Sequence, residues 1–580
     1  MDGQTRKIAV QDSVSDLMHE LDKVVRALAP WVGESRWSGL GGVTDLRTTL
    51  LDSFTLEEGR ERLVSALFIE ATGLKEGRRI HERFFLPILM TTNRSDIIGY
   101  GERMFRVVCS DGEVVVAEGE RTPSYNRKML KTYQEEGRVE TEAGNVVNFM
   151  LRDGFKVPKN LKGLTSTVLG GADTTNIVVR VDAEGMPPLV VKTYKRITEV
   201  NPEPELLEAL AGAGFRHVPK LWGRLVYGVP RQEPTVLSVL ESFEENDGDG
   251  GRPFLDDLVS DLQMLHERCG TTEGASGEYA EGRLRNSTIK DISSHLGGII
   301  AELHHALASY PNEAFEPEPI VEGDVARWSE RARQNLEECF KGLSMLLEEP
   351  RLEPLFKDVI EALLHEAEDV REEIEEEIAR FDMMIGTTKL RTHQDLHLAQ
   401  MLSKKTDTGF DFILIDFEGD PQRSGAERRE KESPLRDLGT MARSFDYVKY
   451  FSLARVLEGI PYPQALAMVA HAYMGARGRT PARSMPTDKF DPRVLGCLTG
   501  YANQWEGMVE EAMVEGYLER SRMLGSSYLH RDGRFDEGFL KSIIKLWKVE
   551  KAILEIRYEL NHRVQNVVIP LEGLVSCVYE

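Results

Sequence analysis

The chain has few cysteines and no long apolar run. Its 580 residues include five cysteines, Cys109, Cys269, Cys339, Cys497 and Cys577, with no Cys-x-x-Cys pair among them. Such a sparse set argues against a zinc site or a disulfide framework and predicts reduced thiols, as in a cytoplasm. A run of about twenty apolar residues, which a membrane-spanning helix needs, is absent from the sequence.

The chain also lacks positive charge. Lysine and arginine number 72 against 96 aspartates and glutamates, which gives a formal net charge of -24. Nucleic acid and anionic membranes repel such a chain, so they are not expected partners. Residues 1–16 lack the basic start and apolar core of a signal peptide, and we therefore expect a cytoplasmic protein. A small molecule, neutral or phosphorylated, is the expected ligand.

The most informative pattern lies in residues 392–421, which read T-H-Q-D-L-H-L-A-Q, a polar turn, and then F-I-L-I-D-F-E-G-D-P. Asp395 is followed five residues later by Gln400 and twenty-one residues later by Asp416, which ends the apolar run. Phosphoryl transfer needs one carboxylate at the acceptor hydroxyl, and an amide oxygen and a second carboxylate on a metal ion. We expect Asp395 to be the proton acceptor, His393 to orient its loop, and Gln400 and Asp416 to bind Mg²⁺.

Residues 156–244 show the pattern of a nucleotide-binding sheet. A turn that reads V-L-G-G-A-D-T-T-N lies between two strand-like runs. Its backbone N–H groups and hydroxyls can cover the phosphate oxygens of ATP, although Gly-Gly turns are more often plain hairpins. The expected phosphate contacts are Gly170, Gly171, Thr174 and Thr175.

Lys192 ends an apolar strand, where a lysine is otherwise poorly placed. We expect it to bind the α- and β-phosphates and to be held by Glu205, with Glu208 as the alternative. An ordinary surface Lys–Glu pair would contribute only about 0–1 kcal/mol and would not require this order of elements. The next strand ends near Glu241, where the backbone of a hinge is expected to meet adenine.

The segments on either side predict a small α+β module and a helical lobe. Residues 1–155 predict a helix that starts after Ser13 and stops at Pro30, followed by strands at 63–70 and 80–90 and a hairpin turned at Asp111 and Gly112. Beyond residue 245, apolar residues recur at helical spacing in segments 254–268, 289–309, 321–347 and 352–385.

Together these patterns predict an α+β chain with a bilobal, protein-kinase-like fold. We expect a small N-terminal α+β domain at 1–155, a nucleotide-binding N-lobe at 156–244, and a large, mainly helical C-lobe at 245–580 that carries the catalytic loop. Asp437, which opens a predicted helix, is expected to hold that loop through backbone N–H groups.

Three sequences carry a family resemblance: H-Q-D-L-H-L-A-Q, D-F-E-G-D-P, and S-P-L-R-D-L-G-T-M-A-R-S-F-D-Y at 433–447. They resemble the signature of maltokinases, in the aminoglycoside-phosphotransferase branch of protein-kinase-like folds. Residues 1–155, with the turn at 30–42, resemble the family's N-terminal α/β cap domain, and residues 550–563 resemble its C-terminal end. The resemblance implies transfer of the γ-phosphoryl of ATP to the anomeric hydroxyl of maltose, in trehalose, glycogen and α-glucan metabolism. It also implies association with a trehalose synthase-type enzyme.

The same resemblance implies a sugar site on the last predicted long helix. A salt-bridged exposed helix would show the same spacing, but carboxylates and an aromatic ring also suit a sugar. The side chains expected to bind substrate are His397, Glu418, Lys551, Glu555, Tyr558, Glu559 and Arg563. Instead of binding the sugar, Glu418 can support a second metal ion.

The sequence departs from the family at two places. Gln394 stands where the family usually has glycine, next to Asp395, and the chain is longer around residues 271–287. The alternatives are a kinase for another sugar or amino sugar such as glucosamine, a non-catalytic kinase-fold binding module, and a docking partner of a trehalose- or glucan-processing enzyme.

Overall fold

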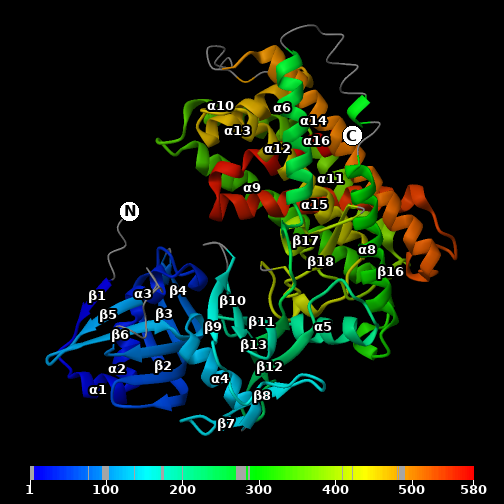
Figure 1. The fold of residues 1–580 in the computed structure, drawn as a ribbon. Helices are drawn as coiled ribbons and strands as arrows, with labels where there is room; N and C mark the ends of the chain where they lie inside the picture. The colour runs from blue at the N-terminus through cyan, green and yellow to red at the C-terminus, as the bar shows by residue number, and fades with distance from the viewer. Residues whose placement is uncertain are drawn as a thin grey trace. The chain divides into compact units, whose positions relative to one another are not determined.

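The structure is a computed structural model that describes residues 6–75, 77–93, 104–135, 137–170, 175–198, 200–269, 282–284, 288–407, 409–420, 422–479, 481 and 490–579. The chain folds into two compact units (Figure 1). The first unit contains Met1–Glu208, Pro219–Glu244 and Gln422–Arg429, and the second contains Ala209–Val218, Glu245–Pro421 and Glu430–Glu580. Most of the longer segment expected at 271–287 lies outside the described residues.

The first unit begins with a six-stranded sheet in the order β1-β5-β6-β4-β3-β2. Its strands are β1 (Arg6–Ala9), β2 (Thr44–Glu58), β3 (Arg62–Lys75), β4 (Arg78–Thr91), β5 (Met104–Val108) and β6 (Glu113–Glu118). β1 pairs with β5 in parallel, and the other neighbours are antiparallel. The predicted strands at 63–70 and 80–90 and the predicted hairpin are confirmed, and β3 and β4 are longer than expected.

A second, antiparallel sheet follows in the order β7-β8-β12-β13-β11-β10-β9. Its strands are β7 (Arg138–Glu140), β8 (Val146–Leu151), β9 (Thr165–Leu169), β10 (Ile177–Ala183), β11 (Met186–Thr193), β12 (Leu221–Gly228) and β13 (Thr235–Ser242). β7 and β8 precede the boundary expected at residue 156. They belong to this sheet because β8 pairs with β12, a long-range backbone pairing that local sequence does not encode.

The helices of this part of the chain are short. They are α1 (Val14–His19), α2 (Leu21–Ala27), α3 (Ala29–Glu34), α4 (Pro123–Glu135) and α5 (Glu203–Gly212). Ser13 caps α1 as predicted, because its side chain accepts a hydrogen bond from the backbone N–H of Asp16. The single helix expected up to Pro30 is wrong. Pro30 lies in the first turn of α3, where a missing N–H has no cost.

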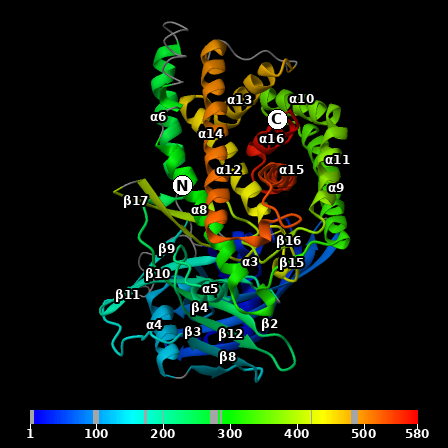
Figure 2. The same cartoon turned by 90° about the vertical axis from the view of Figure 1, so that its right-hand side faces the viewer.

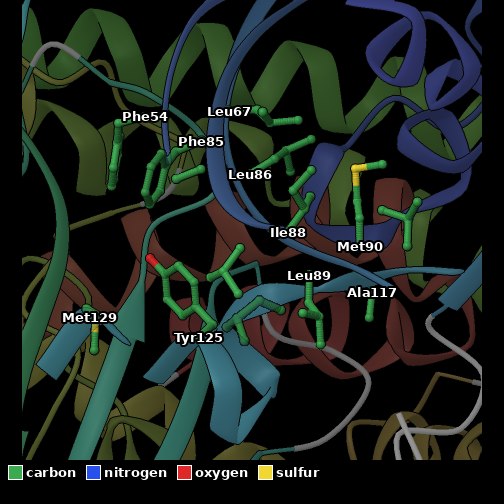
Figure 3. Packing of buried hydrophobic residues seen from close by; sticks show 14 of the residues in the cluster. Phe54, Leu67, Phe85, Leu86, Ile88, Leu89, Met90, Ala117, Tyr125 and Met129 are labelled. Carbon is green, nitrogen blue, oxygen red and sulfur yellow. The ribbon is translucent and has the colours of Figure 1, made fainter. Parts of the chain in front are cut away.

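One apolar core joins both sheets of the first unit. Figure 3 shows Phe54 and Phe85 from the first sheet, and Tyr125 and Met129 from α4. These four side chains are at most 1% exposed. Because α4 packs against β4 and also against β8 and β9, burial of its apolar face holds the two sheets together.

The second unit is mainly helical. Its helices are α6 (Arg252–Cys269), α8 (Ile289–Ser309), α9 (Glu322–Leu347), α10 (Pro354–Asp369), α11 (Arg371–Ala379), α12 (Leu435–Val456), α13 (Tyr462–Ala476), α14 (Pro492–Leu524), α15 (Glu537–His562) and α16 (Val568–Tyr579). The segment expected as one helix at 352–385 is divided into α10, α11 and a 3₁₀ turn. The break falls at Val370, whose backbone leaves the helical conformation (φ -100°, ψ 20°).

Short strands complete the second unit. A three-stranded sheet contains β14 (Gly248–Asp249), β17 (Met401–Thr406) and β18 (Gly409–Leu414), and β15 (Glu318–Pro319) pairs with β16 (Thr388–Lys389). Figure 2 shows the long helix α14 beside α6 and α8, and it packs against both. Among the described helices, none combines the length and apolarity that crossing a membrane requires.

The packing of α6 on α14 corrects the cysteine prediction. Cys269, at the end of α6, and Cys497, in α14, form a disulfide across 228 residues of sequence. Their proximity depends on helix packing, which the spacing of cysteines does not reveal. Cys109, Cys339 and Cys577 are free and buried.

Helix α12 packs against α6, α13, α14, α15 and α16. It approaches α15 most closely at Gly439, where an added Cβ would lie 2.7 Å from the Cβ of Trp547. Backbone atoms of Trp547 and Lys548 would lie within 2.9 Å of the same Cβ. A residue larger than glycine therefore has to push the two helices apart.

We predict that Gly439→Ala lowers the free energy of unfolding by about 1–3 kcal/mol, because it overpacks the contact between α12 and α15. The matched control is Gly500→Ala in α14, whose added Cβ has no heavy atom within 4 Å. That control should be neutral or stabilising by up to about 1 kcal/mol, as for glycine in an exposed helix. Urea denaturation measures both, and equal midpoints for the two variants would contradict the close packing.

Candidate active site

The predicted catalytic residues lie on a loop between β16 and β17 and at the end of the β17–β18 hairpin. Met401 pairs with Leu414 in this hairpin, and the carbonyl of Gln400 accepts a hydrogen bond from the N–H of Ile415 at 3.0 Å. Gln400 and Asp416 are therefore brought next to each other at the open end of the hairpin, although fifteen intervening residues separate them in sequence.

A buried carboxylate holds the catalytic loop. The Oδ2 of Asp437 accepts a hydrogen bond from the backbone N–H of His393 at 2.9 Å, and its Oδ1 accepts one from that of Gln394 at 3.0 Å. The Nε2 of His304, on α8, lies 3.2 Å from the same carboxylate. Burial alone would raise the pKa of Asp437, but these hydrogen bonds and the nearby imidazoles lower it. The role expected of Asp437 is confirmed.

His393 connects this loop to the end of the hairpin. Its Nε2 donates to the carbonyl of Ile415 at 3.0 Å, and its ring packs 4.6 Å from that of Phe417. Two non-glycine residues beside these contacts have left-handed backbones: Gln394 at φ +69° and Asp416 at φ +67°. Such conformations are sparsely populated and persist where the surrounding contacts hold them, as functional sites often do.

Asp395 faces a cation from the C-terminal part of the chain. Its Oδ1 accepts a hydrogen bond from the Nζ of Lys551, on α15, at 2.9 Å, and both side chains are 12% exposed. The Nε2 of His397 lies 3.7 Å from its other oxygen. Burial opposes the charge of Lys551, but the carboxylates of Asp395, Glu555 and Asp420 outweigh it and raise the pKa of Lys551.

The neighbouring imidazole, that of His397, has its pKa shifted down, whereas the pKa of Lys551 is shifted up. Burial, the largest cause, lowers the pKa of His397, and only part of this effect is offset by the Asp395 carboxylate. Asp395 therefore lies between a charged ammonium group and an imidazole that favours its neutral form.

Three other residues expected to bind sugar, Glu555, Tyr558 and Glu559, lie along α15, and Arg563 directly follows it. Arg443 donates from Nε to Glu555 at 3.0 Å, and the hydroxyl of Tyr447 donates to Glu559 at 3.0 Å. Both oxygens of Glu559 also accept hydrogen bonds from Arg563, and this carboxylate is fully buried. Burial raises the pKa of Glu555 and of Glu559, although the neighbouring arginines oppose the rise.

Arg443 and Tyr447 come from α12 and were not among the residues predicted for the site. They lie in the motif at 433–447 that carries the family resemblance. The sequence therefore contained the motif, but the contacts of these two side chains with α15 could not be derived from it. Tyr558 has Arg563 above its ring, 5.2 Å from the centroid. These contacts pair both Glu555 and Glu559 with side chains of the protein, whereas Lys551 contacts Asp395 directly.

In the first unit, Lys192 lies at the end of β11 and is 7% exposed. Its Nζ donates to the Oε2 of Glu203 at 2.7 Å, and the hydroxyl of Tyr194 donates to the same oxygen. The glutamate that holds Lys192 is thus Glu203, and the choice of Glu205 was wrong by two residues. Glu203 is the first residue of α5, where the side chain of Asn201 accepts its N–H at 3.0 Å.

Glu205 has a different partner on the same unit. Its Oε2 lies 3.3 Å from the Nε of Arg429. Because residues two apart on a helix point to different sides, Glu203 and Glu205 cannot share one partner geometry, and the start of α5 decides which one meets β11.

The expected phosphate turn is described in part. Gly170 follows β9 with φ +81°, a conformation that favours glycine, and Thr175 precedes β10. Gly171 and Thr174 lie outside the described residues. Glu241 lies near the end of β13, 7% exposed, opposite Val190 of β11. The contacts of these residues with a nucleotide remain predictions.

Oxygen ligands for a metal ion gather at the end of the hairpin. Carboxylate oxygens of Asp416 and Glu418 lie within 4.8 Å of each other, and Gln400 is the backbone neighbour described above. A carboxylate-rich set of oxygen donors suits Mg²⁺, so these residues fit the predicted ion.

Comparison with known proteins gives relatives but no family model, since none of the models searched matches. The chain is 25% identical over 335 residues to the glucosamine kinase of Streptacidiphilus jiangxiensis, which covers 57% of this chain and 63% of that protein. It is 26% identical over 272 residues to the glucosamine kinase of Mycolicibacterium smegmatis, a match that covers 46% of this chain and 57% of that protein. The chain thus spans about three fifths of the length of these curated relatives.

Solved structures match along nearly the whole chain. A glucosamine kinase in crystal form B superposes with a TM-score of 0.56 at 17% identity, covering 96% of this chain and 99% of that one. A glucosamine kinase in complex with glucosamine, ADP and inorganic phosphate gives a TM-score of 0.53 at 17% identity, covering 96% and 98%. This chain has the glucosamine kinase fold. These matches are named glucosamine kinases, whereas the motifs resemble maltokinases.

The pair formed by Asp395 and Lys551 is testable without a substrate. We predict that a double-mutant cycle with Asp395→Asn and Lys551→Met gives a coupling free energy of about 1–3 kcal/mol in urea denaturation, because each single change leaves a buried charge unpaired.

The matched control is the pair formed by Arg252 and Asp256, 3.5 Å apart and about 60% exposed on both sides. Exposed pairs of this kind couple by less than about 0.5 kcal/mol. Equal coupling in the two cycles would contradict the buried pair at Asp395.

Proposed function

We propose that this chain is an ATP-dependent phosphotransferase that acts on a sugar hydroxyl, with glucosamine as the first acceptor to test. The observation that carries the proposal is the setting of Asp395. Its loop is held by the buried Asp437, its carboxylate is paired with Lys551, and the predicted metal ligands Gln400 and Asp416 are adjacent at the neighbouring hairpin end.

In the proposed reaction, Asp395 accepts the proton of the sugar hydroxyl. The oxygen of that hydroxyl forms a bond to the γ-phosphorus of ATP. The bond from that phosphorus to the bridging oxygen breaks, and ADP leaves. The ammonium group of Lys551 donates a hydrogen bond to the Asp395 carboxylate and offers positive charge beside the acceptor. Lys192, held by Glu203, contacts the α- and β-phosphates.

Gln400, Asp416 and Glu418 would hold Mg²⁺. A bound Mg²⁺ supplies charge neutralisation at the phosphate oxygens, which phosphoryl transfer requires.

The choice of acceptor rests on two kinds of support. Both curated relatives and both superposed structures are named glucosamine kinases, and one of those structures contains glucosamine and ADP. An amino sugar carries a positive charge, which suits a site that holds Asp395, Glu555 and Glu418. Maltose as acceptor, maltose 1-phosphate as product and a trehalose synthase-type partner rest on the sequence resemblance alone.

The test is ADP release from ATP and Mg²⁺ with glucosamine, N-acetylglucosamine, glucose and maltose as separate acceptors. We expect release with glucosamine, at least tenfold less with N-acetylglucosamine, in which the amine is neutral and larger, and none once EDTA removes the metal. Faster release with maltose than with glucosamine would replace the acceptor. Sugar-independent or absent ADP release with all four would overturn the proposed function.

A further inference from the structure

Gln394 has a backbone conformation that is unfavourable for a residue with a side chain. It is 1% exposed and has φ +69°, a conformation that glycine adopts freely and other residues rarely do. The maltokinases that the motif resembles usually have glycine at this place. A glutamine kept in a strained conformation needs a compensating contact.

That contact comes from the end of the side chain. The Nε2 of Gln394 donates to the backbone carbonyl of Glu430 at 2.9 Å. The backbone of Gln394 is fixed separately, because Asp437 accepts from its N–H and Arg436 donates to its carbonyl at 2.7 Å. Glycine would keep both backbone contacts and lose the contact with Glu430.

Glu430 marks the point where the chain passes from one unit to the other. Residues 422–429 belong to the first unit, and residue 430 begins the last part of the second. Arg429 forms ion pairs with Glu205 at 3.3 Å and with Glu233 at 3.5 Å, both in the first unit. An added Cβ at Gly425 would lie 3.3 Å from Val200, so this segment packs closely on the chain before α5.

Two residues later, Glu432 contacts residues of the second unit. The backbone of Glu432 exchanges two hydrogen bonds of 2.9 Å with that of Leu390, and its carboxylate lies 3.0 Å from Arg436. The peptide bond between Arg429 and Glu430 therefore joins a residue held by α5 to a residue held by Gln394.

Helix α5 also carries the residue that holds the predicted phosphate lysine. Glu203 pairs with Lys192, and Glu205, two residues later, pairs with Arg429. A continuous set of contacts thus runs from Lys192 through α5 to Arg429, along the chain to Glu430, and through Gln394 to its neighbour Asp395.

We propose that Gln394 is a positioning residue that couples the nucleotide half of the protein to the catalytic loop. Its side chain transmits a displacement of segment 422–429, which accompanies α5, to the backbone beside Asp395. The inference rests on the proposed function for its effect on turnover, but the coupling itself does not require phosphoryl transfer.

Two variants separate the side-chain contact from the backbone strain. Gln394→Met keeps a long side chain and the cost of φ +69° but cannot donate to Glu430. Gln394→Gly removes both the donor and the strain. We expect both to lower kcat about three- to tenfold, the effect of losing one neutral hydrogen bond, with KM for ATP and sugar within about twofold of the wild type.

Thermal stability distinguishes positioning from a merely structural role. Gln394→Gly should melt at or above the wild-type temperature because its backbone is relaxed, whereas Gln394→Met should melt slightly lower. A loss of kcat in the more stable glycine variant has no explanation in misfolding. Wild-type kcat in Gln394→Gly would overturn the positioning role.

Amide hydrogen exchange tests the coupling without turnover. ADP with Mg²⁺ should slow exchange in peptides covering residues 189–205 in the wild type and in Gln394→Met. In peptides covering 388–398, it should slow exchange in the wild type only. Equal slowing of 388–398 in both proteins would overturn the coupling. If no sugar is phosphorylated but the exchange difference is seen, the proposed function fails and the coupling stands.

Discussion

The hydrogen bonds that Asp437 accepts from two successive backbone amides are the constraint on which the candidate site depends. They fix His393 and Gln394 just before Asp395, and they do so from inside α12, where the carboxylate has no contact with solvent. A buried carboxylate is costly unless its oxygens are satisfied. The two amides and His304 satisfy it, and the same bonds hold the loop in a conformation that it would not adopt by itself.

Buried charged groups are also paired with one another along α12 and α15. Arg436, on α12, donates to the backbone carbonyl of Gln394 in the catalytic loop. Arg443 and Tyr447, on the same helix, donate to Glu555 and Glu559 on α15. Lys551 completes the set from α15 by pairing with Asp395. Gly439 lets α12 and α15 pack closely, which brings Arg443 and Tyr447 to the glutamates of α15.

Local patterns in the sequence were sufficient to predict much of this arrangement. The strand ending at Lys192, the adjacency of Gln400 and Asp416, and the role of Asp437 all follow from short-range spacing and the chemistry of phosphoryl transfer. The predictions that failed depended on longer-range geometry or on where an element begins. Glu203, the first residue of α5, holds Lys192 in place of Glu205, and the Cys269–Cys497 disulfide depends on the packing of two helices whose cysteines are 228 residues apart.

Gln394 shows a third case, in which a residue that looked like a departure from a family pattern has its own contact. The sequence showed that a glycine position was occupied, but neither the left-handed backbone nor the carbonyl of Glu430 could be derived from local spacing. Similarly, motifs resembling maltokinases predicted a sugar kinase site, whereas the similarity of the whole chain is to glucosamine kinases. Motifs report the chemistry shared within a fold, and the acceptor depends on side chains around it.

The most direct test of the account is the transfer of label from γ-³²P-ATP to glucosamine in the presence of Mg²⁺, by the wild type and by Asp395→Asn. The account predicts a labelled sugar phosphate with the wild type. It predicts at least a hundredfold slower labelling with Asp395→Asn, whose ADP affinity should be unchanged because Lys192 and Glu203 are intact. Equal labelling by the two proteins would contradict the role given to Asp395, and no labelled product from the wild type would contradict the choice of acceptor.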